Sequence, residues 1–367
     1  MAALKLATMN VRYAPLDQDP NPPQDVNHEH PWVLRREAIV DQVLWEEPDV
    51  IGFQEVLYHQ LLDLGTLLGR TYAYVGVCRD DGKQAGEASC AHEWATASLR
   101  IQQAVPIFYN QDKLSLRSVQ HFWLSLHPDV PGSHDWDASQ TRMATLAHFK
   151  TRLPTSFSRI YSRDLEAEGS FGGTEGLIEE NLFVLNTHFD DRGRISRQKA
   201  AEIIRKKLGP VARSNIDGKY SLVVLMGDLN SPASEEGYQV LTGYRYVKGR
   251  PEGIDTFMDS RHALVKRAVK KPSSRNLPEP LLHRAYGSQG TFTDFRARSD
   301  GGIIDYIMLA DNGVVEGSGE TASHKPRWRV TKYGVLPNKV EDGIYPFLVV
   351  VHNNYTALCS EETSLGE

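Results

Sequence analysis

Five short polar segments of this sequence have residue types that suit chemistry on a phosphate group. They lie at or near the ends of apolar runs and contain Asn10, Gln54-Glu55, Asn186-Thr187-His188, Asp228-Leu229-Asn230 and Asp305. Asp228 and Asn230 are two residues apart, so in an extended chain their side chains point to the same side. Asn186 and His188 have the same spacing. Carboxylate and amide oxygens are ligands that suit Mg²⁺, and such a site polarises a phosphoryl oxygen and helps to activate water.

Each segment, taken alone, is more often structural, because polar side chains commonly form turns at strand ends. Only the ordered set points to a site. The sequence contains no GxxxxGK[ST], no GxSxG, no HExxH and no cysteine pair with zinc-ligand spacing. The motifs that support P-loop nucleotide hydrolysis, serine-hydrolase chemistry and zinc-protease chemistry are therefore missing.

The composition is that of a soluble globular protein. The 367 residues are 40% hydrophobic and 24% charged, with a formal net charge of −6. The longest apolar runs, Leu222–Met226 and Phe347–Val351, have the length of strands, whereas a membrane-spanning helix needs about 20 apolar residues. The N-terminus has no secretory signal pattern. We expect a monomer with no transmembrane segment and an intracellular, cytoplasmic location.

Cysteine usage points to the same kind of compartment. The three cysteines, Cys78, Cys90 and Cys359, are too few for a disulfide framework, and an odd, low count suits a reducing environment. One loop bridge between Cys78 and Cys90 is the alternative.

Two stretches are rich in basic residues. Residues 192–207 hold seven Lys or Arg and one Glu, and residues 261–275 hold six Lys or Arg and no acidic residue. They could face a phosphate-bearing substrate. For each stretch taken alone, a solvated helix face or a solvated loop is the preferred interpretation.

Hydrophobic periodicity predicts many strands and few helices. The predicted helices are Val33–Trp45, Tyr58–Leu68, Ile195–Leu208 and Ser234–Leu241. The predicted strands are Leu4–Val11, Asp49–Phe53, Tyr72–Val77, Ala104–Tyr109, Val119–Leu124, Met143–Phe149, Leu182–His188, Leu222–Met226, Thr291–Phe295, Ile303–Leu309, Trp328–Tyr333 and Phe347–Val351. Residues 162–180 and 266–290 are predicted loops. This pattern favours two sheets with helices outside. We expect one domain over residues 1–355 and a polar tail over 356–367.

In this order the five segments resemble the endonuclease/exonuclease/phosphatase superfamily. Its members include DNase I-like nucleases, neutral sphingomyelinases, inositol-polyphosphate phosphatases and nocturnin-like deadenylases. The resemblance runs from about Leu4 to about Tyr345. Trp136-Asp137, Arg142 and Arg197 also look like positions of microbial and fungal members. The resemblance implies an α/β fold, a four-layer sandwich of two mostly antiparallel β-sheets packed face to face with helices outside, as in DNase I.

The resemblance also implies a divalent metal, Mg²⁺ or Mn²⁺, at one end of the sandwich. Glu55 is the principal ligand by this comparison, Asn10 assists it, and Asp228 and Asn230 belong to the same metal-binding set.

The implied catalytic set is His188, Asp228, Asn230, Asp305 and Asn186. Asp228 acts as the base and, with Asn230, positions the attacking water and the phosphate. His188 donates to the phosphate in the transition state. Asp305 orients a second histidine, which lies in a Ser-Asp-His sequence before the last strand.

That Ser-Asp-His is absent here. Tyr345 is followed by Pro346 and Phe347, where relatives are expected to continue into Ser-Asp-His. His352 lies at the far end of the last apolar run and is a poor substitute. Removing one preorganised donor of this kind costs about 10²–10³ in rate. It also leaves Asp305 without its usual partner, which favours a raised pKa for that carboxyl.

Two functional hypotheses follow. The first is a Mg²⁺-dependent phosphoesterase that hydrolyses a phosphodiester or phosphomonoester by direct water attack, with activity weakened or lost. The second is a non-catalytic metal- or phosphate-binding relative with a regulatory or interaction role. A gene-model error across residues 340–350 would also explain the missing motif. The substrate class stays open between nucleic acid, nucleotide, inositol phosphate and lipid headgroup.

Overall fold

The computed structural model describes most of the chain. The described residues are 3–14, 31–83, 102–154, 177–213, 215–216, 219–243, 257–263, 285–288, 290–292, 302–310, 314–316, 323–325, 328–336, 339–340, 343–344 and 349–355.

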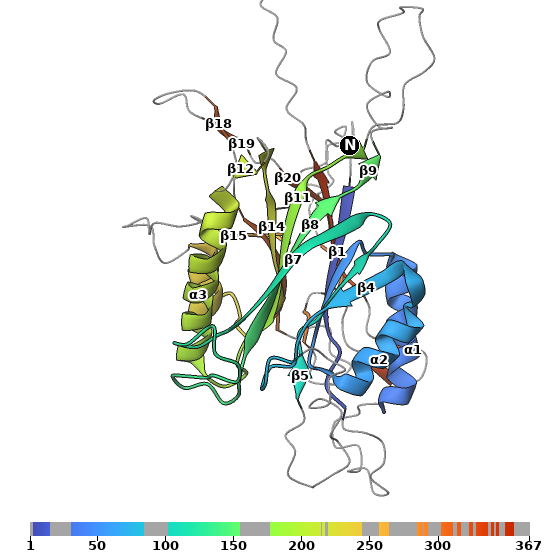
Figure 1. The fold of residues 1–367 in the computed structure, drawn as a ribbon, viewed down its shortest axis with the longest axis vertical. Helices are drawn as coiled ribbons and strands as arrows, with labels where there is room; N and C mark the ends of the chain where they lie inside the picture. The colour runs from blue at the N-terminus through green and yellow to red at the C-terminus, as the bar shows by residue number, and fades with distance from the viewer. Residues whose placement is uncertain are drawn as a thin grey trace, which may run out of the picture.

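Two sheets form the centre of the molecule (Figure 1). The seven-stranded sheet has the order β16 (Tyr286–Gly287), β20 (Trp328–Val335), β23 (Val349–Tyr355), β1 (Ala3–Asn10), β2 (Val50–Gln54), β6 (Ile107–Asn110) and β4 (Tyr72–Val75). The six-stranded sheet has the order β15 (Phe257–Asp259), β17 (Asp305–Ala310), β14 (Leu222–Asp228), β11 (Asn181–His188), β8 (Met143–Thr151) and β7 (Leu114–Trp123). Most neighbours are antiparallel. The parallel pairs are β1 with β2, β11 with β14, and β16 with β20.

Short two-stranded ladders complete the strands. They pair β3 (Val56–Leu57) with β5 (Gln103–Ala104), β9 (Leu153–Pro154) with β10 (Leu177–Ile178), β12 (Asn215–Ile216) with β13 (Lys219–Tyr220), β18 (Val314–Glu316) with β19 (Ser323–Lys325), and β21 (Lys339–Val340) with β22 (Gly343–Ile344).

Helices cover the outer face of each sheet (Figure 1). On one side, α1 (Trp32–Glu46) and α2 (Tyr58–Leu67) bury Ile39, Val43 and Leu64 against the seven-stranded sheet. On the other side, α3 (Arg194–Arg213) and α4 (Glu236–Thr242) bury Ile204 and Leu241 against the six-stranded sheet. The predicted four-layer sandwich is confirmed.

The interior between the sheets changes from apolar to polar along the strands. Side chains alternate between the two faces of a strand, so every second residue faces this interior. The inward apolar residues include Leu4 and Leu6 of β1, Leu182 and Val184 of β11, Leu222, Val224 and Met226 of β14, and Ile307 and Leu309 of β17. In each of these strands the same alternation places a polar residue at one end, namely Asn10, His188, Asp228 and Asp305. The strand period therefore brings four of the predicted site residues to one end of the interior.

An amide clamp joins the two sheets close to that end. The Asn186 Nδ2 of β11 donates to the carbonyls of Phe53 and Pro106, at 2.8 Å each. Gln54 Nε2 of β2 donates to Asn186 Oδ1 at 2.7 Å. Asn186 and Gln54 are fully buried, and buried polar groups are stable only when they are hydrogen-bonded.

Two predicted strands differ from the structure. Ala104–Tyr109 is divided into β5 and β6, because Pro106 has no N–H to donate to a ladder. Thr291 and Phe292 are not in a strand. Instead, Thr291 Oγ1 accepts from the N–H groups of Ile304 and Asp305. The rest of the predicted strand Thr291–Phe295 lies outside the described residues, and β16 falls within the predicted loop 266–290.

Cys78 is disulfide-bonded, which differs from the expectation of free thiols. Both other cysteines, Cys90 and Cys359, lie outside the described residues, as does the predicted tail 356–367. Among the helices of the described part, none has the length and apolar character of a membrane span.

Gly52 is expected to be intolerant of any side chain. A Cβ there would lie 2.7 Å from Asn186 Cγ and Oδ1 and 2.9 Å from Met226 Sδ. We predict that Gly52→Ala lowers the free energy of unfolding by about 1–3 kcal/mol, because overpacking would displace the amide clamp. Urea denaturation measures it. Gly302→Ala is the control, since nothing lies within 4 Å of that Cβ; equal loss in both variants would contradict the steric explanation.

Candidate active site

One amide brings the two sheets together at the polar end of the interior. Asn10 Nδ2 donates to Glu55 Oε1 at 2.9 Å and to Asp228 Oδ2 at 3.0 Å. Asn10 Oδ1 accepts from the N–H of Arg12 at 2.9 Å, which fixes the amide orientation. Two carboxylates from different sheets therefore face the same small volume.

Glu55 follows β2 directly and has φ 59°. Non-glycine residues rarely adopt this left-handed conformation, and it is often found at functional sites. Glu55 Oε2 accepts from the N–H of Tyr13 at 3.1 Å, and the Arg12 guanidinium lies 3.8 Å away.

Two buried side chains from the helices α1 and α2 hold the segment after β1. Arg35 Nη1 of α1 donates to the carbonyl of Val11 at 2.5 Å. Gln60 of α2 donates to the carbonyl of Arg12 at 3.1 Å and accepts from the N–H of Leu57 at 3.1 Å. These contacts position the backbone that binds Glu55.

Asp228 ends β14 and is opposite Asp305 of β17 in the antiparallel pair. Both carboxyls are almost completely buried. Burial raises the pKa of Asp228 to about 6, while hydrogen bonds from Asn10 and Asn230 oppose this rise. Burial and the charge of Asp228 raise the pKa of Asp305 well above its ordinary value. The two carboxyls thus compete for ionisation.

The residues beside Asp228 have unusual backbone conformations. Gly227 has φ 139°, and a Cβ there would lie 2.0 Å from the Thr187 carbonyl oxygen. Asn230 has φ 45°, and its N–H donates to Asp228 Oδ1 at 2.9 Å. The end of β14 therefore requires a glycine before Asp228, and the turn after β14 points a backbone donor at the carboxylate.

His188 has a defined tautomer. Arg142 Nη1 lies 2.9 Å from His188 Nδ1, and arginine has donors only. Nδ1 must therefore accept, and the ring proton is on Nε2, which lies 3.7 Å from Asp228 Oδ2. Asn230 Nδ2, 3.1 Å from Nε2, donates to the Phe189 carbonyl at 3.1 Å. With the proton on Nε2, the Asn230 amide makes no hydrogen bond to that nitrogen, and Nε2–H is the donor that the ring offers to a phosphate oxygen.

The environment of His188 disfavours its protonation. Burial lowers the pKa of His188 well below its ordinary value, and the positive charges of Arg142 and Arg79 act in the same direction. His188 is a neutral hydrogen-bond donor in this structure.

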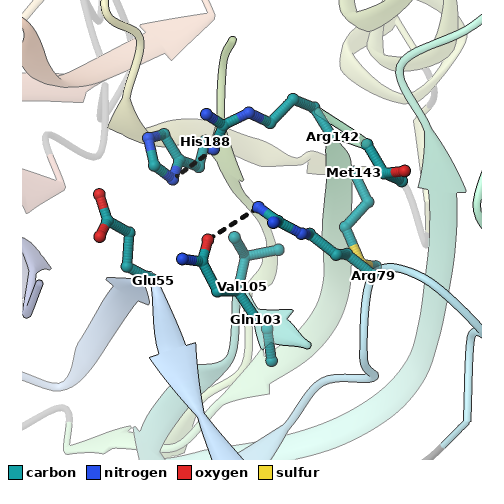
Figure 2. A pocket seen from close by; sticks show the side chains of 9 residues that line it. Glu55, Arg79, Gln103, Val105, Arg142, Met143 and His188 are labelled. Carbon is teal, nitrogen blue, oxygen red and sulfur yellow. Dashed lines mark hydrogen bonds between the residues drawn. The ribbon is translucent and has the colours of Figure 1, made fainter. Parts of the chain in front are cut away.

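A pocket opens beside His188 and Glu55 (Figure 2). Arg79, Gln103 and Arg142 form its other polar walls. The sequence-based search did not select Arg79 or Gln103. Neither residue belongs to a distinctive sequence motif. The burial of a charged side chain is the one signal that points to Arg79, and burial is known only from the structure.

Three residues selected by resemblance lie behind the site. Asp137 accepts from the N–H groups of Ser196 and Ile195, at 2.7 Å and 3.1 Å, at the start of α3. Arg197 pairs with Glu235 at 2.7 Å. The left-handed Trp136 precedes Asp137 with φ 58°. They hold the loops that carry Arg142 and Asn230.

Asn186 is separate from the cluster formed by Asn10, Glu55, His188 and Asp228. Its amide is bonded within the clamp between the sheets, so its contacts are structural, and they do not support the expected catalytic role.

The C-terminal strand excludes His352 as the missing histidine. His352 pairs with Lys5, and Val349 pairs with Thr8. His352 is therefore five residues along β1 from Asn10, about 16 Å at the rise of a strand. Residues 345–348, which precede β23, lie outside the described part, as does Asp342.

The donor set fits a hard divalent cation. Within the described ranges, no group of three or more His, Cys, Asp or Glu has metal-binding geometry. Mg²⁺, however, keeps several waters and is commonly bound by only one or two carboxylates. Glu55 and Asp228, joined by Asn10, supply two carboxylates, and a cation there would offset the burial that raises the pKa of Asp228.

Comparison with known proteins gives the family and the fold. Residues 7–340 match the model of the Endonuclease/Exonuclease/phosphatase family. An endonuclease/exonuclease/phosphatase from Bacteroides vulgatus has a similar structure, with a TM-score of 0.65 and 23% sequence identity over 97% of this chain and 100% of that chain.

A mannosyl-6-phosphatase from Bacteroides thetaiotaomicron is similar, with a TM-score of 0.63 and 24% identity over 96% of this chain and 100% of that chain. The human Nocturnin catalytic domain has a TM-score of 0.55 and 13% identity over 96% of this chain and 95% of that chain. No curated protein matches the chain. At these identities the structural likeness concerns the fold.

Asp305→Asn is predicted to raise the Tm of the metal-free protein at pH 7.5. When the pKa of a carboxyl is higher in the folded than in the unfolded state, the folded protein loses stability as the pH rises above the unfolded pKa of about 4. The gain should therefore shrink as pH falls toward 4. Calorimetry in EDTA measures it. Asp190→Asn should destabilise instead, because Asp190 accepts four backbone N–H bonds that lower its pKa. A lower Tm for Asp305→Asn would contradict the proposed repulsion between the Asp305 and Asp228 carboxyls.

Arg142→Gln should disturb the tautomer of His188. ¹⁵N NMR of the wild-type protein at pH 7 is expected to show a neutral ring protonated on Nε2, and the variant a mixture of tautomers. His121 is the internal reference, because burial lowers its pKa to about 4 and Arg142 does not contact it. An Nδ1 proton on His188 in the wild type would disprove the assignment.

Proposed function

Since the chain belongs to the endonuclease/exonuclease/phosphatase family, we propose that it is a Mg²⁺-dependent phosphoesterase, which hydrolyses a phosphodiester or phosphomonoester by direct attack of water. The observation that carries this proposal is the convergence of Asn10, Glu55 and Asp228 around one amide nitrogen, beside His188.

Glu55 and Asp228 would hold the metal, with Asn10 and Asn230 beside them, and Mn²⁺ would suit the same oxygens. The bound cation would polarise a phosphoryl oxygen and favour an ionised attacking water. It would also relieve the repulsion between the buried carboxyls, because a divalent charge lowers the pKa of nearby acids.

The protein groups have separate tasks. Asp228 takes a proton from water as the new bond to phosphorus forms and the ester P–O bond breaks. His188 donates its Nε2–H to a non-bridging oxygen, where negative charge grows. Asn230, which contacts both His188 and Asp228, would help to position the water and the phosphate.

The departing ester oxygen still needs a proton. By family resemblance that proton comes from the histidine of Ser-Asp-His, which this sequence lacks. We therefore propose hydrolysis slower than in complete relatives by about 10²–10³. Asp305, which has no such histidine, stays buried with a raised pKa.

The second candidate is a relative that binds metal or phosphate without turnover. The missing Ser-Asp-His favours it. Either way the partner is a phosphate ester of unassigned class. A sugar phosphate belongs in the substrate panel, because a similar structure is a mannosyl-6-phosphatase.

We keep a monomeric state and an intracellular, cytoplasmic location as proposals from the sequence. The disulfide of Cys78 counts against a reducing cytoplasm, since disulfides persist mainly in oxidising compartments.

Hydrolysis of bis(p-nitrophenyl) phosphate and p-nitrophenyl phosphate with Mg²⁺ tests the proposal. We expect slow turnover that EDTA stops and that Glu55→Ala lowers by at least about 10²-fold. Glu37→Ala, on the exposed face of α1, is the control and should change nothing. Binding of Mg²⁺ by calorimetry without turnover supports the non-catalytic candidate. Turnover that survives Glu55→Ala would refute the site.

A further inference from the structure

Two arginines lie in the pocket beside the proposed phosphate site, and neither is assigned to a phosphate oxygen in the proposed cleavage. Their side chains are 13% exposed for Arg79 and 6% for Arg142. Figure 2 shows both guanidinium groups directed to the side of the pocket where His188 and Glu55 lie.

The positive charge of Arg79 is poorly balanced by its neighbours. Its two terminal nitrogens donate to the neutral amide oxygens of Gln103 and Gln140, at 2.7 Å each. The carboxylate of Asp80 lies 3.7 Å from Nε, beyond hydrogen-bond distance. Buried charges are usually paired with opposite charges, yet among the described residues the two terminal nitrogens of Arg79 meet neutral amide oxygens and no carboxylate.

Arg142 adds a second cation to the same wall. It pairs with Asp191 at 2.9 Å through one nitrogen and donates to His188 through another, and its Nε lies 3.7 Å from Asp190 Oδ2. In the described part of the chain, neither Arg142 Nε nor Arg79 Nε has a hydrogen-bond partner, and both atoms are buried. Burial and the charge of Arg142 lower the pKa of Arg79 to about 10, as expected for two cations close together.

The pocket therefore contains a negative and a positive half. Glu55 lies on the metal side, and Arg79 and Arg142 lie on the other side, with His188 between them. A phosphoryl group seated against the metal side and His188 would place its next substituent toward the arginines. Planar guanidinium groups suit phosphate oxygens in both geometry and charge.

We propose that Arg79 and Arg142 form a subsite for a second phosphate group, adjacent to the phosphate that is cleaved. The substrate class is thus an ester with two neighbouring phosphates, such as a diphosphate ester or a bisphosphate, and simple monophosphates are the weaker ligands. This inference rests on the proposed function, because the position of the first phosphate comes from it.

Calorimetry with the full chain in Mg²⁺, and again in EDTA, tests the subsite with inorganic phosphate and methylenediphosphonate. We expect the diphosphonate to bind at least about tenfold more tightly than phosphate. Arg79→Gln should lower its affinity by about tenfold and the affinity of phosphate much less. Arg117→Gln, an exposed cation of β7, should change neither. Arg79→Lys retains the charge and should bind the diphosphonate with an affinity between those of the wild type and Arg79→Gln. It also serves as the test if Arg79→Gln does not fold.

Equal weakening of both ligands by Arg79→Gln, or no preference for the diphosphonate in the wild type, would overturn the subsite. These results are independent of turnover. Hydrolysis of monophosphates without a diphosphonate preference leaves the proposed phosphoesterase intact and removes the subsite. A diphosphonate preference that depends on Arg79, without any hydrolysis, supports the subsite in a protein that binds and does not cleave.

Discussion

The repulsion between carboxyls buried at one end of the sandwich is the constraint on which the site depends. Asp228 and Asp305 face each other across an antiparallel pair and are almost inaccessible to water. Glu55 shares Asn10 with Asp228. Water cannot screen these charges, so protons, amide hydrogens or a cation must balance them. The raised pKa values of Asp228 and Asp305 mean that a proton is one way to balance these charges. The cluster of oxygen ligands suits a cation as another.

The surrounding fold holds these groups together against their repulsion. The amide clamp of Asn186 and Gln54 ties the sheets directly behind the site, and Gly52 permits that close approach. Glu55 and Asn230 are held in left-handed conformations by contacts from neighbouring elements. Such backbone costs persist only where the rest of the structure over-determines the position.

The basic side of the site has a different origin. Burial, with the charge of Arg142, lowers the pKa of His188, and Arg142 leaves the ring proton on Nε2, so the imidazole contributes a dipole rather than a charge. Positive charge comes from Arg79 and Arg142 in the pocket wall. The sequence change before the last strand removes a histidine that relatives are expected to use, but leaves this basic wall in place.

Local sequence pattern was sufficient for the layers of the fold and for most of the site. The alternation that ends in Asn10, His188, Asp228 and Asp305 has a period of two, which can be read without knowledge of any partner strand. The ordered set of polar strand ends was also sufficient to identify the family. Pro106 and Thr291 show the limit of this reading, because their roles depend on contacts with distant segments.

Only the tertiary structure decided which polar residues share one volume. It assigned Asn186 to the clamp, placed His352 at the opposite end of β1, and brought Arg79 to His188. It also determined the tautomer of His188 through Arg142. The physical reason is that a residue's own segment determines the face on which its side chain lies. The register between strands and the packing of one sheet on the other determine what it meets there.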